Sequence, residues 1–404
     1  MNDIVTKITS DRFIKYIQFF NLFNNNTQIE KINGIDYYIN EFWTSKQRAG
    51  LFLHEISYRA CFKPQLPEFF INILTSEGNW VLDPFMGRGT TPVQSVFMHR
   101  QAAGSDINPL SLLLTRPRMK PPKFTDIVDR LSEIKKNYSA NIPMQEELLA
   151  FYHPDTLVEI LNLRSFLLEN SPISGDVDPI NDWIRMVALN RLTGHSAGFF
   201  STYTLPPNQA VSISSQIKIN QRLNKLPPYK NTSDLILKKT RQLLKDNILY
   251  SKASFNLSIS KAWELYYLND SSIDLVITSP PFLDIVNYKE DNWLRNWFAG
   301  INDSEIDLSQ FKNVNHWHQM IHKVSLELSR VLKKGGYLVI EVGEVRGGKI
   351  KLEEYVWKAL ENLPFKPICV LINQQNFTKT SNCWGVGNNQ KGTNTNRIII
   401  AQKI

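Results

Sequence analysis

The feature that most constrains the fold is the stretch 81–91 (VLDPFMGRGTT), where an apolar strand leads into a glycine-rich turn and then a helix. Gly87 and Gly89 permit backbone conformations closed to other residues and let a ligand approach the main chain. Thr90 and Thr91 are expected to cap the next helix, whose free N–H groups favour electronegative ligand atoms. Turns of this kind also simply connect the strands of parallel sheets. The stretch therefore predicts an α/β fold with a ligand or close packing at this turn.

Two further strands are expected to end in chemically distinctive residues. Residues 100–106 (RQAAGSD) read as a short strand ending at Asp106, and the spacing from the glycine turn suits a βαβ unit. An acid at the tip of the second strand of such a sheet commonly binds a ribose hydroxyl pair, so Asp106 is the ribose candidate. Residues 273–278 form an apolar strand that ends in the rigid tip Ser279-Pro280-Pro281-Phe282, the most specific signal in the sequence.

The glycine turn (83–91, DPFMGRGTT) and the tip Ser279-Pro280-Pro281-Phe282 together resemble the amino-methyltransferases of DNA. These enzymes use S-adenosylmethionine to methylate cytosine N4 or adenine N6. Residues 62–67 (FKPQLP) resemble a further cofactor motif of the family. The resemblance covers most of residues 50–119 and 262–404. It implies an α/β fold, a Rossmann-like seven-stranded class I methyltransferase sheet with a mostly helical inserted segment.

The resemblance also implies which residues contact the cofactor S-adenosylmethionine. Asp106 is expected to hold its ribose, Asp270 to meet its adenine edge, and Lys63, Pro64 and Leu66 to border its methionine end. The full expected cofactor set is Lys63, Pro64, Leu66, Asp83, Pro84, Phe85, Gly87, Gly89, Thr90, Asp106 and Asp270.

The tip Ser279-Pro280-Pro281-Phe282 is the expected catalytic set. An exocyclic amine needs no covalent enzyme intermediate when the methyl group is already activated, so the protein has to align and orient the reactants. Ser279 Oγ and the Pro280 carbonyl can accept the two amine protons, and Phe282 can stack on a base flipped out of the duplex. Ser before Pro-Pro-aromatic resembles the cytosine-N4 enzymes, whereas Asp or Asn is typical of the adenine enzymes. Adenine N6 stays open as an alternative.

Four segments are predicted along the chain. Residues 1–45 form an N-terminal extension, 46–122 the cofactor-binding half, 123–255 a helical and loop insertion, and 256–404 the catalytic half. The cofactor half precedes the catalytic half, whereas many members of the family have the reverse order. The insertion is therefore assigned to target recognition on its position and composition alone.

The composition is that of a globular protein with 42% hydrophobic and 21% charged residues, and its net charge of +8 favours a polyanionic partner such as double-stranded DNA. Aromatic, amide and basic residues in the insertion suit a DNA-reading surface, but a solvated basic face is an equal alternative. The cations concerned are Lys218, Arg222, Lys225, Lys230, Lys238, Lys239, Arg241 and Lys245. Three scattered cysteines and the lack of an apolar leader predict a cytoplasmic protein.

Other classes fit less well. A carbon-5 cytosine methyltransferase needs a cysteine nucleophile after proline, and none of Cys61, Cys369 and Cys383 follows one. A dehydrogenase is disfavoured because the turn lacks the GxGxxG spacing. No metal is expected, since Tyr58 replaces the second histidine that an HExxH helix starting at His54 would need. An RNA amino-methyltransferase and an inactive cofactor-binding scaffold are the remaining alternatives, and a cognate restriction endonuclease is a possible partner.

Overall fold

The computed structural model describes residues 9–43, 50–58, 61–137, 143–204, 210–246, 253–281, 283, 288–302, 304, 306, 311, 313–345, 349–374 and 395–404. The helices are α1 (Ser10–Gln18), α2 (Gln65–Leu74), α3 (Thr90–Phe97), α4 (Pro109–Met119), α5 (Phe124–Asn137), α6 (Pro154–Asn170), α7 (Pro179–Leu189), α8 (Ile213–Leu223), α9 (Thr232–Leu243), α10 (Tyr288–Ala299), α11 (Val314–Val331) and α12 (Leu352–Leu360), with 3-10 turns η1 (Phe52–His54) and η2 (Glu146–Ala150). The strands are β1 (Gln28–Ile32), β2 (Ile35–Asn40), β3 (Trp80–Asp83), β4 (Gln101–Asp106), β5 (Phe255–Ile259), β6 (Ile273–Thr278), β7 (Leu332–Val342), β8 (Glu344–Val345), β9 (Ile350–Lys351), β10 (Phe365–Gln374) and β11 (Thr395–Lys403).

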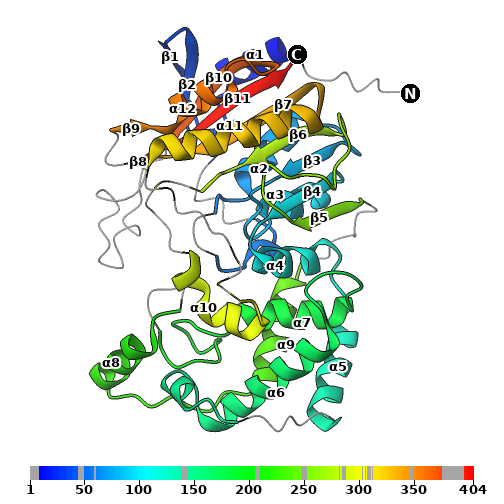
Figure 1. Cartoon of the computed structure of the whole chain (residues 1–404), viewed down its shortest axis with the longest axis vertical. Coiled ribbons are helices and arrows are strands. Elements are labelled where there is room, and N and C mark those ends of the chain that lie inside the picture. Colours follow the sequence, from blue (N-terminus) through cyan, green and yellow to red (C-terminus); the bar gives the residue numbers. More distant parts are fainter. Residues whose placement is uncertain are drawn as a thin grey trace.

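Within the described chain, one sheet has the strand order β1-β2-β10-β11-β7-β6-β3-β4-β5 (Figure 1). The strands β7, β6, β3, β4 and β5 run parallel, and β11 is antiparallel to both β7 and β10. This confirms the expected Rossmann-like sheet, and the antiparallel pair β10 and β11 lies inside it, with β2 and β1 beyond β10.

The sheet is larger than the seven strands expected, because the N-terminal segment contributes two more. β1 and β2 form a hairpin, and β2 pairs in parallel with β10. Residues 1–45 therefore do not form a separate extension in their described part. Their strands pair with a strand more than 300 residues later, and α1 buries Phe13 and Ile17 in the core.

Alternate residues of the central strands pack on opposite faces of the sheet, as the two-residue period of a strand requires. Leu275 and Ile277 of β6 join an apolar cluster with residues of α1 and α2. Val276, between them, joins a different cluster with residues of α11 and α12. Both faces of β6 are buried, which suits its apolar run Leu275-Val276-Ile277, and the buried Asp274 pairs with Lys333 at 2.8 Å.

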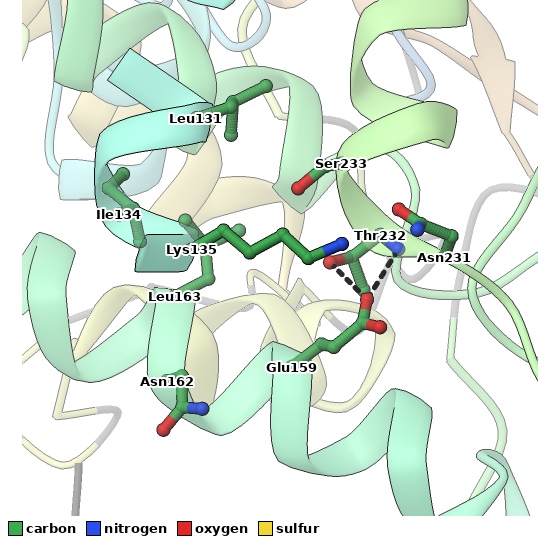
Figure 2. A pocket seen from close by; sticks show the side chains of 9 residues that line it. All are labelled: Leu131, Ile134, Lys135, Glu159, Asn162, Leu163, Asn231, Thr232 and Ser233. Carbon is green, nitrogen blue, oxygen red and sulfur yellow. Dashed lines mark hydrogen bonds between the residues drawn. The ribbon is translucent and has the colours of Figure 1, made fainter. Parts of the chain in front are cut away.

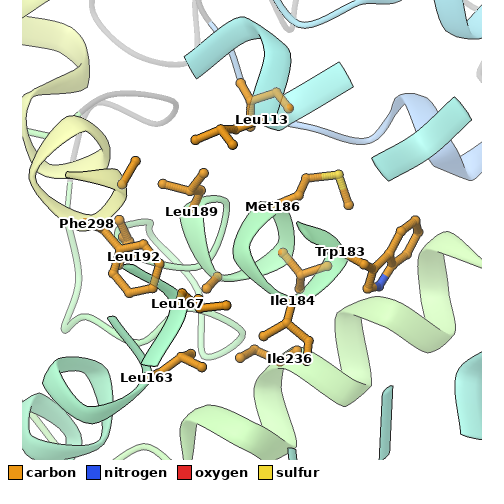
Figure 3. Close-up of a cluster of buried hydrophobic side chains, with 14 of the residues drawn as sticks. Leu113, Leu163, Leu167, Trp183, Ile184, Met186, Leu189, Leu192, Ile236 and Phe298 are labelled. Atoms are coloured by element: carbon orange, nitrogen blue, oxygen red, sulfur yellow. The ribbon is translucent and has the colours of Figure 1, made fainter. Parts of the chain in front are cut away.

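The inserted segment forms a helical lobe beyond the β5 edge of the sheet (Figure 1). Figure 3 shows its core, where side chains from α4, α6, α7, α9 and α10 meet. Trp183 and Ile184 of α7 are fully buried, and Phe298 of α10 is 1% exposed. Helices α4 and α10 come from the two predicted methyltransferase halves, residues 46–122 and 256–404, and not from the insertion. The lobe therefore shares a continuous hydrophobic core with those halves.

A pocket in this lobe lies between α5, α6 and the start of α9 (Figure 2). The Glu159 carboxylate accepts hydrogen bonds from the backbone N and the Oγ1 of Thr232, both at 2.8 Å. Glu159 thus already supplies the negative charge that the N-terminus of α9 favours. We therefore interpret the pocket as structural.

Candidate active site

The strand ends that the sequence predicted as functional lie together, at the carboxyl ends of three neighbouring parallel strands. β3 pairs in parallel with both β4 and β6, so their carboxyl ends point the same way. The glycine turn follows β3, Asp106 ends β4, and Ser279 follows β6. In open parallel sheets, ligands bind at these ends of the strands.

A hydrogen bond joins the glycine turn to the Ser-Pro-Pro tip. Thr278 Oγ1 donates to Asp83 Oδ1 at 2.7 Å, and the Phe85 backbone N donates to the same oxygen at 3.1 Å. Asp83 is 1% exposed, and this burial raises the pKa of its carboxyl group to about 7, although the hydrogen bonds oppose the rise. The buried Asp83 and Pro84 therefore fix the start of the turn relative to the residue just before Ser279.

The glycine turn needs both of its glycines. Gly87 and Gly89 have φ angles of +50° and +76°, and a Cβ atom on Gly89 would overlap the side chain of Thr115. The expectation that Thr90 and Thr91 cap the next helix is wrong, because Gly89 is the N-cap and no side chain caps α3. Thr90 and Thr91 are buried in the first turn, so the main-chain N–H groups there have no side-chain cap.

Asp106 faces the glycine turn. Its Oδ2 accepts a hydrogen bond from Gly87 N and its Oδ1 one from Asn108 N, both at 2.9 Å. The Ser111 side chain and the Ile107 backbone also interact with this carboxylate, and burial raises its pKa above the ordinary value. Two buried polar atoms near Asp106 have no hydrogen-bond partner among the described residues. They are Asn108 Nδ2, two residues later in the chain, and Ser260 Oγ, whose backbone N donates to the Asp106 carbonyl. These groups fit the polar ribose of a nucleoside.

Ser279 faces a buried acid that the motifs do not include. Glu341 lies on β7, the strand next to β6, and its carboxyl group forms side-chain hydrogen bonds with Ser279 and with Asn396 of β11. Glu341 is 6% exposed, and burial raises the pKa of its carboxyl group to about 7, with both hydrogen bonds opposing the rise. When Glu341 is ionised, it can only accept, so Ser279 donates its hydroxyl proton. The lone pairs of Ser279 Oγ then remain available to another donor.

A tryptophan of α11 holds the backbone of the tip at Pro281. Trp317 is fully buried, and its Nε1 donates to the Pro281 carbonyl at 2.8 Å. Pro280 is buried beside it. The expected stacking residue Phe282 lies outside the described residues.

The structure places Asp270 away from the other expected site residues, so its assignment to the adenine edge needs correction. Asp270 precedes β6, whereas Ser279 follows it, and the six residues of that strand separate the two ends by about 20 Å. Its carboxylate is 76% exposed and pairs with Arg330 of α11 at 2.6 Å. The assignment of Asp270 rests on resemblance to the family, but its place before β6 puts it at the end of that strand opposite Ser279.

The segment 62–67 is tied to the glycine turn through Arg88. The guanidinium of Arg88 donates to the carbonyls of Ile56 at 2.9 Å and Phe62 at 3.4 Å. Lys63 is exposed and Pro64 half-buried at the start of α2, and partial burial lowers the pKa of Lys63. Leu66, at 1% exposure, packs in the apolar cluster under the sheet. Lys63 and Pro64, rather than the side chain of Leu66, are thus the accessible members of this group.

Sequence reasoning missed Glu341, Trp317, Thr278 and Arg88. Glu341 carried a usable signal, because it is an acid within the otherwise apolar stretch 337–342. Trp317 lies on a long amphipathic helix, where an aromatic residue is indistinguishable from any other core residue.

In the described part of the chain, no three His, Cys, Asp or Glu side chains are grouped so that they could hold a metal ion. His54 is buried and its Nε2 lies 2.9 Å from Gln94 Oε1, while the neighbouring Glu55 pairs with Lys239 at 3.1 Å. The helices of the described residues also include none that is long and apolar enough to span a bilayer.

A family model described as DNA methylase matches residues 13–113 and 273–402, on both sides of the helical insertion. The chain belongs to this DNA methylase family. The two matched regions contain the glycine turn, Asp106, Ser279 and Glu341, while most of the helical lobe lies between them.

Two curated relatives are similar to this chain over different lengths. The Type II methyltransferase M.MjaII of Methanocaldococcus jannaschii is 32% identical over 115 residues, which are 28% of this chain and 21% of the relative. The Type II methyltransferase M.MvaI of Kocuria varians is 24% identical over 317 residues, 70% of this chain and 65% of the relative. The matches thus span about a fifth and just under two thirds of these relatives.

Among solved structures, a DNA modification methylase of Thermus thermophilus, named as putative in its description and complexed with S-adenosyl-L-methionine, is 21% identical. The match covers 35% of this chain and 50% of that chain, with a TM-score of 0.23. The similarity is slight, and the fold assignment rests on the strand order of this chain itself.

Proposed function

We propose that this DNA methylase transfers a methyl group from S-adenosylmethionine to the exocyclic N4 amine of a cytosine flipped out of double-stranded DNA. One observation carries the proposal. The hydrogen bond between Thr278 and Asp83 holds the glycine turn against the Ser279 tip, so a cofactor on the turn and a base at the tip would be neighbours.

The residues at the edge of the sheet suit the cofactor. The uncapped first turn of α3, the half-exposed Asp106 and the accessible Pro64 are the groups that would hold it. When bound, S-adenosylmethionine supplies a methyl group activated by its sulfonium. No acid–base activation of the methyl donor is then required of the protein.

The protein's own part in the reaction is to orient the amine. Ser279 Oγ, with its hydroxyl proton directed to Glu341, accepts one amine proton, and the Pro280 carbonyl accepts the other. These two contacts direct the nitrogen lone pair away from the tip and towards the methyl group. The Trp317 hydrogen bond to the Pro281 carbonyl fixes the backbone on which both acceptors depend.

Glu341 also provides a destination for the proton that the methylated amine must lose. With a pKa of about 7, its carboxylate can take a proton through Ser279 near neutral pH. The same network needs Glu341 to be ionised before the reaction, so the proposal includes a dependence of the rate on pH.

The biological setting proposed is a restriction-modification or related system in the cytoplasm, with DNA as the substrate and a cognate endonuclease as partner. The names of the two curated relatives, both Type II methyltransferases, support it.

Nucleoside mass spectrometry tests the function. Purified protein is incubated with unmethylated genomic DNA and S-adenosylmethionine, and the DNA is digested and searched for N4-methylcytosine. Ser279→Ala is the matched variant, expected to slow methyl transfer more than it weakens cofactor binding. N6-methyladenine without N4-methylcytosine would overturn the choice of base and leave DNA amino-methylation standing. Methylation of RNA alone would overturn the substrate.

A further inference from the structure

The helix α8 is attached to the protein by amides instead of an apolar face. Gln216, the buried residue of this helix, donates to the Tyr203 carbonyl at 3.0 Å and accepts from Thr204 Oγ1 at 3.0 Å. One turn later, Asn220 donates to the Ala150 carbonyl at 2.7 Å. An isolated helix of 11 residues is marginal in water, so these contacts fix its position.

The opposite face of α8 projects into solvent. Residues opposite Gln216 and Asn220 on the helix, or just past its end, are Ser214, Lys218, Gln221, Arg222 and Lys225, and all are exposed. Every one carries hydrogen-bond donors, and three are cationic. Such side chains contact phosphates and the base edges of the major groove, a groove wide enough for a helix.

The sequence around α8 carries charge of one sign, although the exposed acids Glu146 and Glu147 lie in η2, which packs against α8. Residues 183–233 contain six Lys or Arg and no Asp or Glu. The cations of α9 and its end differ, because several are used inside the protein. Lys239 is buried and pairs with Glu55, and Arg241 lies over the ring of Phe124 at 4.9 Å. Lys218, Arg222 and Lys225, by contrast, are all exposed and lie close together in the sequence, although Lys238 and Lys245 of the α9 region are exposed as well.

Hydrogen bonds connect the start of α8 to α10. The residues leading into it, Ala210 and Val211, are held by α10: Ala210 N donates to the Asp291 carbonyl at 3.3 Å, and Trp293 Nε1 donates to the Val211 carbonyl at 3.2 Å. In the sequence, α10 follows the Ser279 tip. Figure 1 shows α8 and α10 on the same side of the molecule.

We infer that α8 is the helix by which this protein holds duplex DNA, with Lys218, Arg222 and Lys225 on the phosphates and Gln221 at a base edge. The inference rests on the proposed function and adds the element that contacts the substrate. Exposed Ile217 and Leu226 beside this face suit thymine methyl groups. The absence of any acid from residues 183–233 favours DNA over a second copy of the chain, whose docking would need a complementary surface.

The test is a triple variant, Lys218→Ala, Arg222→Ala and Lys225→Ala. Its matched control, Lys323→Ala, Lys334→Ala and Lys366→Ala, removes the same charge from exposed positions on α11, β7 and β10. Affinity for a mixed-sequence DNA duplex is measured by fluorescence anisotropy across a range of salt. We expect the α8 variant to bind at least tenfold more weakly at 0.1 M salt, with a log–log salt slope smaller by about two to three units. The control should bind like the wild type.

Equal losses in both triple variants would mean that only the net charge matters, and no loss in either would mean that α8 faces away from DNA. Either result overturns the inference. Size-exclusion chromatography tests whether α8 instead contacts a second copy of the chain. Loss of self-association in the α8 variant, with DNA binding intact, would show that it does. Circular dichroism verifies that the variants are folded.

The wild type is assayed for DNA methylation in parallel. Methylation by the wild type together with unchanged DNA binding by the α8 variant would refute the role of α8 alone. A wild type that does not methylate DNA would refute the proposed function itself.

Discussion

The contact between Glu341 and Ser279 makes the reaction rate dependent on pH. Above a pKa of about 7, the Glu341 carboxylate accepts the Ser279 hydroxyl proton and leaves the Ser279 lone pairs for the base amine. Below it, the protonated acid can itself donate to Ser279 and compete with the amine. We therefore expect the rate of methyl transfer to fall as the pH drops through this pKa, down to a floor set by the loss of the charged acceptor, and Glu341→Gln to remove that dependence.

The size of the loss follows from the hydrogen bond. The amide introduced by Glu341→Gln would keep an acceptor oxygen but no charge, and charge-assisted hydrogen bonds exceed neutral ones by about 1 to 1.5 kcal/mol. The rate at pH 8 should then fall about 5- to 13-fold if Glu341 only orients Ser279. A loss of about 100-fold or more would indicate that it also takes the proton.

Stability should respond to the same substitution. A pKa raised from 4.5 to about 7 means that the folded protein holds a proton that the unfolded chain releases between these pH values. Wild-type stability is therefore favoured below pH 4.5 and declines as pH rises to 7, by at most about 3.4 kcal/mol from this group. Glu341→Gln lacks this decline, while Asp83, with a pKa also raised to about 7, continues to contribute its own.

Single-turnover methyl transfer between pH 5.5 and 8.5, and urea unfolding at pH 5 and pH 8, measure both effects. Asp270→Asn is the matched control, because it also replaces a carboxylate by an amide but at the opposite end of β6, and it should leave the pH profile unchanged. The reasoning is refuted if Glu341→Gln retains the wild-type inflection near pH 7.

Three further substitutions test other parts of the site. Asp106→Ala should weaken S-adenosylmethionine binding by about 10- to 100-fold in calorimetric titration, through loss of charge-assisted hydrogen bonds, and an unchanged dissociation constant would remove Asp106 from the site. Trp317→Phe deletes the donor to the Pro281 carbonyl, so kcat should fall several-fold, about 1 kcal/mol, without a change in cofactor affinity; a change in affinity alone would contradict this role. Gly89→Ala should lower the free energy of unfolding by more than about 1 kcal/mol, since alanine is strained at this φ angle and meets Thr115. Urea unfolding with the wild-type midpoint would show that the turn can relax.

Much of the site was predictable because its signals are local. A strand, a glycine turn and the start of a helix lie within 11 consecutive residues, and the rigid Ser-Pro-Pro tip is equally compact. Parallel strands present their carboxyl ends at one edge, so local motifs at these ends were enough to predict that Asp83, Asp106 and Ser279 lie on the same edge of the sheet. The sequence alone thus determined the fold class and most of the residues around this edge.

Only the tertiary structure determined the features that depend on contacts between residues far apart in the chain. Strand β2 joins the sheet only through β10, and Ser279 meets Glu341 only because β6 and β7 are neighbours. The pairing of Asp270 with Arg330 of α11, at the end of β6 opposite Ser279, was likewise visible only in the structure. The same holds for charge: Lys218 and Lys239 look alike in sequence, yet one is exposed and the other is buried against Glu55. Burial and pairing are set by contacts between residues far apart in the chain, which local propensity and periodicity do not encode.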